Sequence, residues 1–241
     1  MGRKPKRVRD ANRSHTRQTA PPLPPRPMGA RATAGARGGW QRYALPPSIA
    51  TALGQTLHRT PLTGQDWSFH SGEGEQGNDL PMRQLNVRSK KVWREMAQSI
   101  LLELPWRCPR CNVLLASHST TAIDLNVIDP GAALWPHVDV DHQGKPAIIT
   151  LLQPAVSGGL FYVAKRPHED GVDGVAWRGV EEGPAIARRA RDMDFVHMLV
   201  PGDVCMVNGC DHVHEVTRVT GARARVTLSI TPKCPKREVD V

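Results

Sequence analysis

Between Ala122 and Asp139 the chain reads AIDLNVIDPGAALWPHVD. Residues 122–128 form a short apolar segment with several β-branched side chains, which is typical of a strand. Pro130-Gly131 then supplies a turn signal. His137 and Asp139 lie two residues apart, so on a strand their imidazole and carboxylate share one face. The stretch therefore predicts a strand and a turn that present two polar side chains together.

Four further segments have the same sequence pattern, and together they predict a mainly β fold. Each is short and apolar and is bounded by Gly, Pro, Asp or Asn: residues 147–152, 160–163, 204–207 and 225–230. Several short strands separated by turn signals indicate a sandwich or a barrel. Residues 165–200 interrupt these strands, and 185–193 within them is expected to be a short helix or a mobile insert.

Apolar side chains recur at helical spacing between residues 87 and 104. They are Val92, Trp93, Met96, Ile100, Leu101 and Leu104. This stripe predicts a helix that packs against the core, and Pro105 is expected to end it. A shorter helix is expected over 47–57. We interpret residues 41–120 as a helical support region for a β core over 121–235.

The positive charge is concentrated at the N-terminus. Residues 1–40 hold ten of the 32 Lys and Arg residues and one acidic residue, Asp10, whereas residues 41–241 hold 22 basic and 22 acidic residues. A DNA-binding domain usually carries its own basic face, so this distribution argues against that class. Residues 1–40 also contain six prolines and five glycines. Such a segment buries too little apolar surface to offset its ordering entropy, and we expect a disordered tail.

The sequence indicates an intracellular protein, cytoplasmic or nuclear. No apolar run approaches the length of about 20 residues that spans a bilayer, and the start lacks the apolar region of a secretory signal. Five cysteines are too few for a secreted disulfide scaffold. The basic cluster Arg3–Arg9 fits a nuclear localisation signal, a patch that binds polyanions, or a solvated tail without a targeting signal. Nucleic acid is therefore expected as a partner only through residues 1–40.

A third candidate ligand lies far along the chain from His137 and Asp139. The segment Asp211-His212-Val213-His214-Glu215-Val216 offers two histidines. Two histidines and one carboxylate form the facial triad of non-haem Fe(II) oxygenases, which leaves metal positions open for substrate and oxygen. His212 and His214 compete for the third place.

Three further motifs accompany these candidates. Ser157-Gly158-Gly159 is a turn that feeds a strand, and Pro201-Gly202-Asp203 is a turn before the strand that leads to His214. Arg223, Arg225 and Thr227 have the same parity, so on a strand they share a face. An arginine guanidinium can bind a carboxylate with two parallel hydrogen bonds.

The ordered set of motifs resembles the Fe(II)- and 2-oxoglutarate-dependent dioxygenases, particularly the prolyl-hydroxylase-like branch. The matching pieces, over about residues 121–232, are Pro-Gly-x-x-x-x-Pro-His-x-Asp (130–139), Ser-Gly-Gly (157–159), Pro-Gly-Asp (201–203) and His-Glu-Val with a later Arg (214–223). The resemblance implies a double-stranded β-helix, or jelly-roll barrel, with helices outside. It implies that His137, Asp139 and His214 bind Fe(II), since the Glu-Val that follows the family's ligand comes after His214.

The resemblance also implies the cosubstrate site and the reaction. A basic residue would hold the C5 carboxylate of 2-oxoglutarate; Arg223 fits the family's spacing from His214, while Arg225-Val226-Thr227 fits the Arg-x-Ser form of other branches. The tyrosine that many members use beside the cosubstrate is not apparent, and Asn126 or Thr150 is expected in its place. With Fe(II), 2-oxoglutarate, O2 and ascorbate as an accessory, the expected reaction is hydroxylation of a C–H bond, with release of succinate and CO2. In the related halogenases a small residue replaces the carboxylate, so the presence of Asp139 implies hydroxylation or another oxidation.

Substrate and function class stay open at this point. The resemblance favours a protein residue of prolyl type or an amino-acid-like molecule, and a free small metabolite is the alternative. A non-catalytic protein that acts through its basic tail belongs to a different class. A third reading starts from Cys108-Pro109-Arg110-Cys111, which has the spacing of a zinc knuckle. A structural zinc ion would need two more ligands, for which Cys205, Cys210, Cys234 and His118 are available; the alternative is unpaired thiols near a turn.

Overall fold

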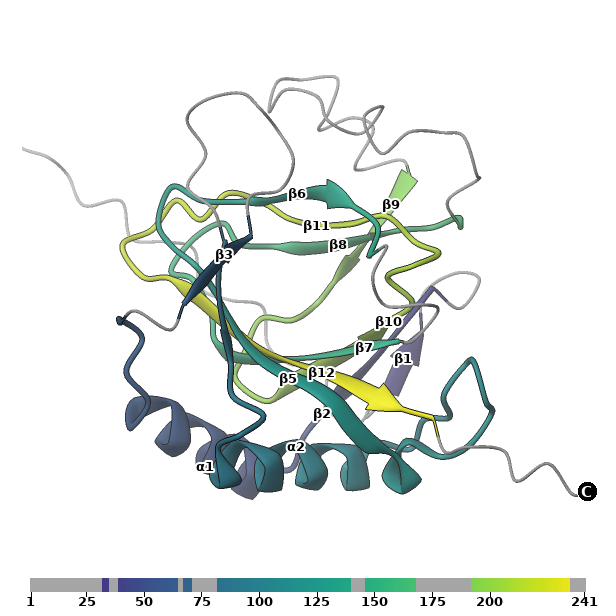
Figure 1. The fold of residues 1–241 in the computed structure, drawn as a ribbon. Coiled ribbons are helices and arrows are strands. Elements are labelled where there is room, and N and C mark those ends of the chain that lie inside the picture. The colour runs from purple at the N-terminus through teal and green to yellow at the C-terminus, as the bar shows by residue number, and fades with distance from the viewer. Residues whose placement is uncertain are drawn as a thin grey trace, which may run out of the picture.

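The computed structural model describes residues 32–34, 39–64, 67–70, 82–139, 146–167 and 192–234. Within these ranges the strands form two antiparallel sheets of eight and four strands that face each other, and two helices cover the outer face of the larger sheet (Figure 1). The predicted mainly β double-stranded β-helix with flanking helices is confirmed. The described part of the chain contains no helix long and apolar enough to cross a membrane.

The larger sheet is built from both ends of the described chain. Its strands, in spatial order, are β1 (Ala32–Ala34), β2 (Trp40–Ala44), β10 (Asp203–Val207), β7 (Ala147–Gln153), β12 (Arg225–Lys233), β5 (Ser119–Ile128), β4 (Met82–Asn86) and β3 (Ser68–His70). The smaller sheet has the order β6 (Leu134–His137), β11 (His214–Val216), β8 (Phe161–Ala164) and β9 (Met193–Val196). The region 41–120 thus supplies strands as well as the helices α1 (Pro47–His58) and α2 (Lys91–Glu103).

Two apolar layers fix which side of each central strand faces the barrel. Alternate residues of β12 (Val226, Leu228 and Ile230) pack toward the helices with Trp93 and Leu53. The other layer lies between the two sheets and includes Ile128, Leu151, Phe161, Val163 and Cys205. Because strand side chains alternate, Arg225 and Thr227 face the space between the sheets.

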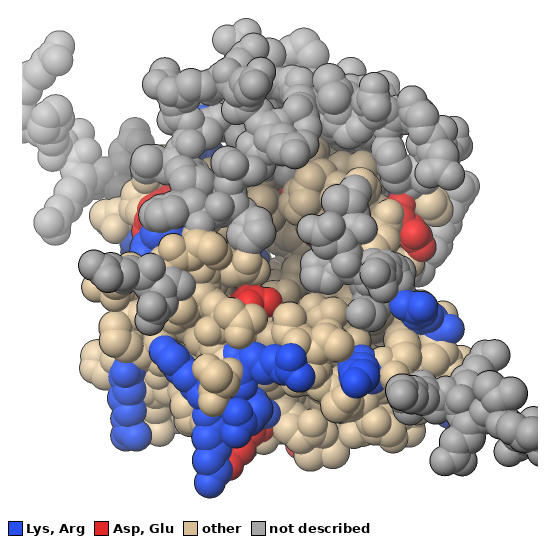
Figure 2. Space-filling model, in the orientation of Figure 1, with Lys and Arg blue, Asp and Glu red and all other residues tan. Residues whose placement is uncertain are grey.

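Helix α2 buries a stripe that differs from the predicted one at its first residue. Trp93, Ala97, Ile100 and Leu101 are buried, whereas Val92 is 45% exposed. The helix ends at Glu103, ahead of Pro105 as predicted. Exposed basic residues surround its first turn, namely Arg88, Lys90, Lys91 and Arg94. Figure 2 shows basic side chains along the lower part of the same view.

Replacing Trp93 by Ala is expected to lower the free energy of unfolding by about 3–5 kcal/mol, because the indole is fully buried and would leave a cavity. Urea denaturation measures this value. Val92→Ala is the matched control on the same helix, with an expected change within about 0.5 kcal/mol. Equal effects of the two substitutions would contradict the orientation of α2.

Some sequence predictions lie outside the described residues. Most of the expected tail over 1–40 falls there, although β1 and the first residue of β2 belong to the larger sheet. The expected helix or insert over 185–193 is likewise outside up to residue 191, and Met193 begins strand β9.

Candidate functional site

The smaller sheet brings together three side chains that are separated in the sequence. His137 ends β6 and is the register partner of His214, the first residue of β11. Asp139 follows β6, and its Oδ1 lies 3.5 Å from His137 Nε2 and 3.6 Å from His214 Nε2. One candidate ligand atom from each residue falls within 4.8 Å of the others. The structure therefore places the three predicted ligands in one group.

His214 is oriented by its surroundings. Its Nδ1 lies 3.2 Å from the carbonyl oxygen of His212, which leaves Nε2 directed toward Asp139. The ring of Phe161 meets the imidazole edge to face, with centroids 6.1 Å apart. The side chain of His214 is 5% exposed and that of His137 is 34% exposed, so the group is open to solvent on the side of His137.

His212, the competing histidine, has a different place. Its Nδ1 lies 2.9 Å from the carbonyl oxygen of Ala164. Its ring packs against Gly39, where a Cβ would come within 2.6 Å of it. His212 is a buried packing residue and is outside the three-residue group.

Gly209 makes room for the Asp139 carboxylate. The backbone N–H of Asp139 donates to the Gly209 carbonyl at 2.8 Å. A Cβ on Gly209 would lie 2.1 Å from Asp139 Oδ2 and 3.1 Å from His214 Cε1. Glycine is required here by this close approach, and sequence reasoning missed it because residue 209 belongs to none of the recognised motifs.

Gly209→Ala is expected to weaken Fe(II) binding by about 10- to 100-fold, the range seen when groups that orient ligands are disturbed, because the methyl group displaces Asp139. Anaerobic titration with Fe(II) measures this. Gly54→Ala in helix α1 is the control, since a Cβ there meets nothing within 4 Å. If Gly209→Ala bound Fe(II) as the unaltered chain does, Asp139 would not be held at this position.

Polar side chains from the larger sheet point into the barrel. Arg225, at the start of β12, is 3% exposed, and its Nη2 is buried without a hydrogen-bond partner in the described part of the chain. Burial lowers the pKa of Arg225 to about 10, although the neighbouring Cys205 raises it. A buried cation without an anionic partner is costly, so this guanidinium is suited to receive an anion.

Thr227 and Asn126 lie beside Arg225 on the same face. They are register partners across β12 and β5. Thr227 is 4% exposed, and Asn126 Oδ1 is buried without a partner among the described residues. These two side chains and Arg225 offer hydrogen-bond donors and acceptors to a small polar ligand between the sheets.

The Ser-Gly-Gly turn explains how Arg225 fits beneath the smaller sheet. Gly158 and Gly159 have φ of 68° and 63°, a left-handed conformation that favours glycine. A Cβ on Gly158 would lie 1.9 Å from the Arg218 carbonyl oxygen, and one on Gly159 would lie 3.2 Å from Arg225 Cδ. The turn therefore leaves the space that the Arg225 side chain occupies.

Two of the predicted cosubstrate residues lie elsewhere. Arg223 is exposed, precedes β12, and donates from Nε to the Pro154 carbonyl at 3.0 Å. Thr150 is buried, but it shares a face of β7 with Ile148 and Leu152, which pack toward the helices. The structure thus brings Arg225, Thr227 and Asn126 to the barrel interior, and it does not bring Arg223 or Thr150 there.

The Pro-Gly-Asp turn has a structural role. Asp203 is fully buried; its Oδ2 accepts from the N–H groups of Leu199 and Val200 at 2.9 Å. Its Oδ1 lies 2.8 Å from Arg42 Nη2. Arg42 comes from β2, a strand that sequence reasoning did not detect. Because Asp203 pairs with it, Arg42 is a weaker candidate for an anion than Arg225.

No protein-family model matches the sequence, and no curated protein matches it. Among solved structures, the chain is similar to a prolyl-4-hydroxylase from Pseudomonas putida, with a TM-score of 0.53 and 15% identity, over 81% of this chain and 93% of that one. It is also similar to SnoN, a non-haem alpha-ketoglutarate-dependent epimerase from nogalamycin biosynthesis, with a TM-score of 0.50 and 14% identity, over 80% and 78% of the two chains. The chain therefore has the double-stranded β-helix fold of the Fe(II)- and 2-oxoglutarate-dependent oxygenases.

Proposed function

We propose that this protein is an Fe(II)- and 2-oxoglutarate-dependent dioxygenase that hydroxylates a C–H bond of a prolyl-like protein residue or an amino-acid-like substrate. The observation that carries this proposal is one barrel that holds both a His-Asp-His group and a buried, unpartnered arginine. The His-Asp-His group suits a divalent iron ion, and the buried arginine suits one carboxylate of a dicarboxylate. Succinate and CO2 are the expected coproducts.

His137, Asp139 and His214 would hold the iron. Two imidazoles and one carboxylate are the donor set of non-haem Fe(II) oxygenases, and the three candidate atoms lie within 4.8 Å of one another. Gly209 and His212 support them, through the space left for Asp139 and the carbonyl that orients His214. Fe(II) bound there would couple the oxidative decarboxylation of 2-oxoglutarate to oxidation of the substrate.

Arg225 would hold the C5 carboxylate of 2-oxoglutarate. A carboxylate supplies the anion that the buried guanidinium lacks, through hydrogen bonds strengthened by charge. Thr227 and Asn126, on the same face, would donate further hydrogen bonds to the cosubstrate. We assign the binding of the C5 carboxylate to Arg225 and not to Arg223, because Arg223 is exposed and already donates a hydrogen bond to the Pro154 carbonyl.

Two solved structures of similar fold suggest two classes of substrate. The fold similarity to a prolyl-4-hydroxylase supports a prolyl-like residue. SnoN, with a similar fold, is an epimerase, so a different reaction on the same scaffold is the second candidate, with a free small metabolite as the substrate. Hydroxylation stays the first choice because of the fold similarity to the prolyl-4-hydroxylase.

Anaerobic titration of the full chain with Fe(II) and then 2-oxoglutarate tests the proposal. We expect a visible metal-to-ligand charge-transfer band that forms only when both are present. The band is expected to disappear in His137→Ala and to require a higher 2-oxoglutarate concentration in Arg225→Met.

A folded chain that gives no band would overturn the assignment, and the non-catalytic protein that acts through its tail would then be favoured. That alternative predicts binding to polyanions that weakens with salt and vanishes when residues 1–40 are removed. If the band forms, incubation with O2 and candidate peptides, followed by mass spectrometry for a gain of one oxygen atom, distinguishes hydroxylation from other oxidations.

A further inference from the structure

A second cluster of metal-binding side chains lies outside the barrel. Cys108, Cys111, His118 and Cys234 each place one candidate ligand atom within 4.8 Å of the others. The thiol sulfurs of Cys108 and Cys234 are 3.6 Å apart, and Cys111 Sγ is 3.2 Å from His118 Nε2. Three thiols and one imidazole gathered in this way could hold one metal ion.

The separations match those of a tetrahedral zinc site. Zinc binds Cys sulfur at about 2.3 Å and His nitrogen at about 2.0–2.1 Å. A tetrahedron with these bond lengths has edges of about 3.8 Å between sulfurs and about 3.5 Å between sulfur and nitrogen. The observed separations of 3.6 Å and 3.2 Å are close to both.

The backbone around Cys108 forms a tight hairpin that presents both of its cysteines. Arg107 and Leu114 form an antiparallel bridge. The N–H of Asn112 donates to the Cys108 carbonyl at 2.8 Å, and the N–H of Cys108 donates to the Val113 carbonyl at 2.8 Å. Asn112 has a φ of 57°, which lets the chain turn sharply just after Cys111. The Cys-x-x-Cys pair thus lies at the tip of a structured turn.

The pairing of β5 with β12 brings together the other two candidate ligands, His118 and Cys234. Ser119 begins β5 and is the register partner of Lys233, which ends β12. His118 and Cys234 flank these partners, so the antiparallel pairing brings them together. His118 is 2% exposed, and its Nδ1 lies 2.9 Å from the Leu114 carbonyl. This contact fixes the ring so that Nε2 faces the thiols, as a hydrogen bond to the second nitrogen does in known metal sites.

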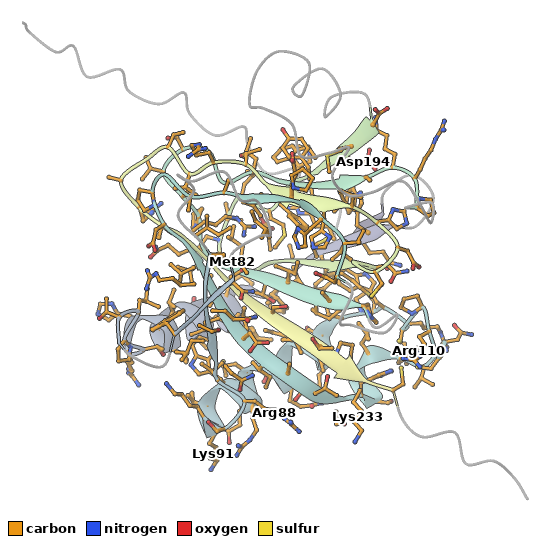
Figure 3. All side chains as sticks on the ribbon, turned by 45° about the horizontal axis from the view of Figure 1, so that its top comes forward. Met82, Arg88, Lys91, Arg110, Asp194 and Lys233 are labelled. Carbon is orange, nitrogen blue, oxygen red and sulfur yellow. The ribbon has the colours of Figure 1, made fainter. Side chains whose placement is uncertain are left out.

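We propose that Cys108, Cys111, His118 and Cys234 bind one structural Zn²⁺ ion. Three thiolates and one imidazole are a common closed set of zinc ligands, with no position left for a substrate. The ion would tie the hairpin that follows α2 to the end of β12. Figure 3 shows Arg110, which precedes Cys111, and Lys233, which precedes Cys234, toward the same lower right side of the molecule.

The zinc site is separate from the proposed iron site. Arg225, the proposed cosubstrate anchor, begins β12, and Cys234 follows its last residue, so the two are about 30 Å apart along an extended strand. The role of this zinc ion would therefore be to stabilise the fold. The two sites share no residue, so a substitution in one site leaves the ligands of the other unchanged and the two can be tested independently.

Zinc content of the full chain, purified under reducing conditions without a metal-binding tag, tests the proposal. Inductively coupled plasma mass spectrometry is expected to find one zinc ion per chain. The Cys108→Ser/Cys111→Ser variant should lose it and unfold at a lower temperature. The His137→Ala/Asp139→Ala variant should keep it, which separates this site from zinc bound adventitiously at the triad.

Cys205→Ala is the matched thiol control. Cys205 is buried between the sheets and lies outside the cluster, so its removal should leave one zinc ion per chain. If the double serine variant does not fold, His118→Cys carries the test. That variant should retain the metal, and its Co²⁺ derivative should show stronger sulfur-to-cobalt charge transfer, because four thiolates replace three.

Three results would overturn the proposal. One is an unaltered chain that stays free of zinc after refolding with excess Zn²⁺. Another is zinc that is lost from the triad variant and kept by the cysteine variant. The third is a count of three thiols instead of five in the unfolded, metal-free chain prepared without reductant, because a disulfide between Cys108 and Cys234 would then explain their approach.

Discussion

Asp139→Ala is expected to abolish succinate formation from 2-oxoglutarate, by about a thousandfold or more, while the chain stays folded. The carboxylate lies between the two imidazoles and supplies the negative charge of the group. Its loss would remove one of three ligands, and the several kcal/mol that a bound metal ion contributes to catalysis would be lost with it. Succinate release in the presence of Fe(II) and O2 is the measurement, with circular dichroism to verify the fold.

Asp211→Ala provides the control for Asp139→Ala. Asp211 is an exposed carboxylate in the turn before His214, and it accepts a hydrogen bond from Asn208. Its removal is expected to leave succinate formation within about twofold, as for other surface substitutions. Comparable losses in both variants would indicate that the turn, and not the Asp139 carboxylate, controls activity.

Arg225→Met is expected to raise the KM for 2-oxoglutarate by about 10- to 150-fold, the equivalent of about 1.5–3 kcal/mol for a hydrogen bond to a charged group. The side chain is buried and no carboxylate pairs with it in the described residues. Arg223→Met is the matched control, with an expected change below about twofold, because Arg223 is exposed. Steady-state kinetics with varied 2-oxoglutarate provide both values.

The effect on folding separates this role from a purely structural one. Replacing an unpaired buried guanidinium by an apolar side chain of similar size is expected to leave the stability unchanged or to raise it. Arg225→Met should therefore raise KM without lowering the melting temperature. A larger effect on KM from Arg223→Met than from Arg225→Met would return the cosubstrate anchor to the residue that the family spacing favours.

The candidate ligands were predictable because their geometry is local. His137 and Asp139 lie two residues apart, so their side chains stay close even though Asp139 falls just beyond the last residue of β6. His214 was found from the residues that follow it. Its packing and its pairing with His137 depend on strand partners, which a single sequence does not reveal.

The cosubstrate residues were harder to predict, for two physical reasons. Arg223 and Arg225 have the same parity, but parity has meaning only within a strand, and β12 begins at Arg225. Thr150 lies on β7, a strand buried on both faces. The sequence pattern of β7 therefore does not show which face of the strand lies toward the barrel interior and which lies toward the helices.

The position of β12 has a consequence for the order of folding. This strand follows every other described strand in the chain, yet it lies between β7 and β5 in the larger sheet. Until it has left the ribosome, both neighbours expose unpaired edges, which invite association with other chains. We expect the barrel to close only after synthesis of residues 225–233, so a chaperone that shields β-strand edges would matter most before these residues are made.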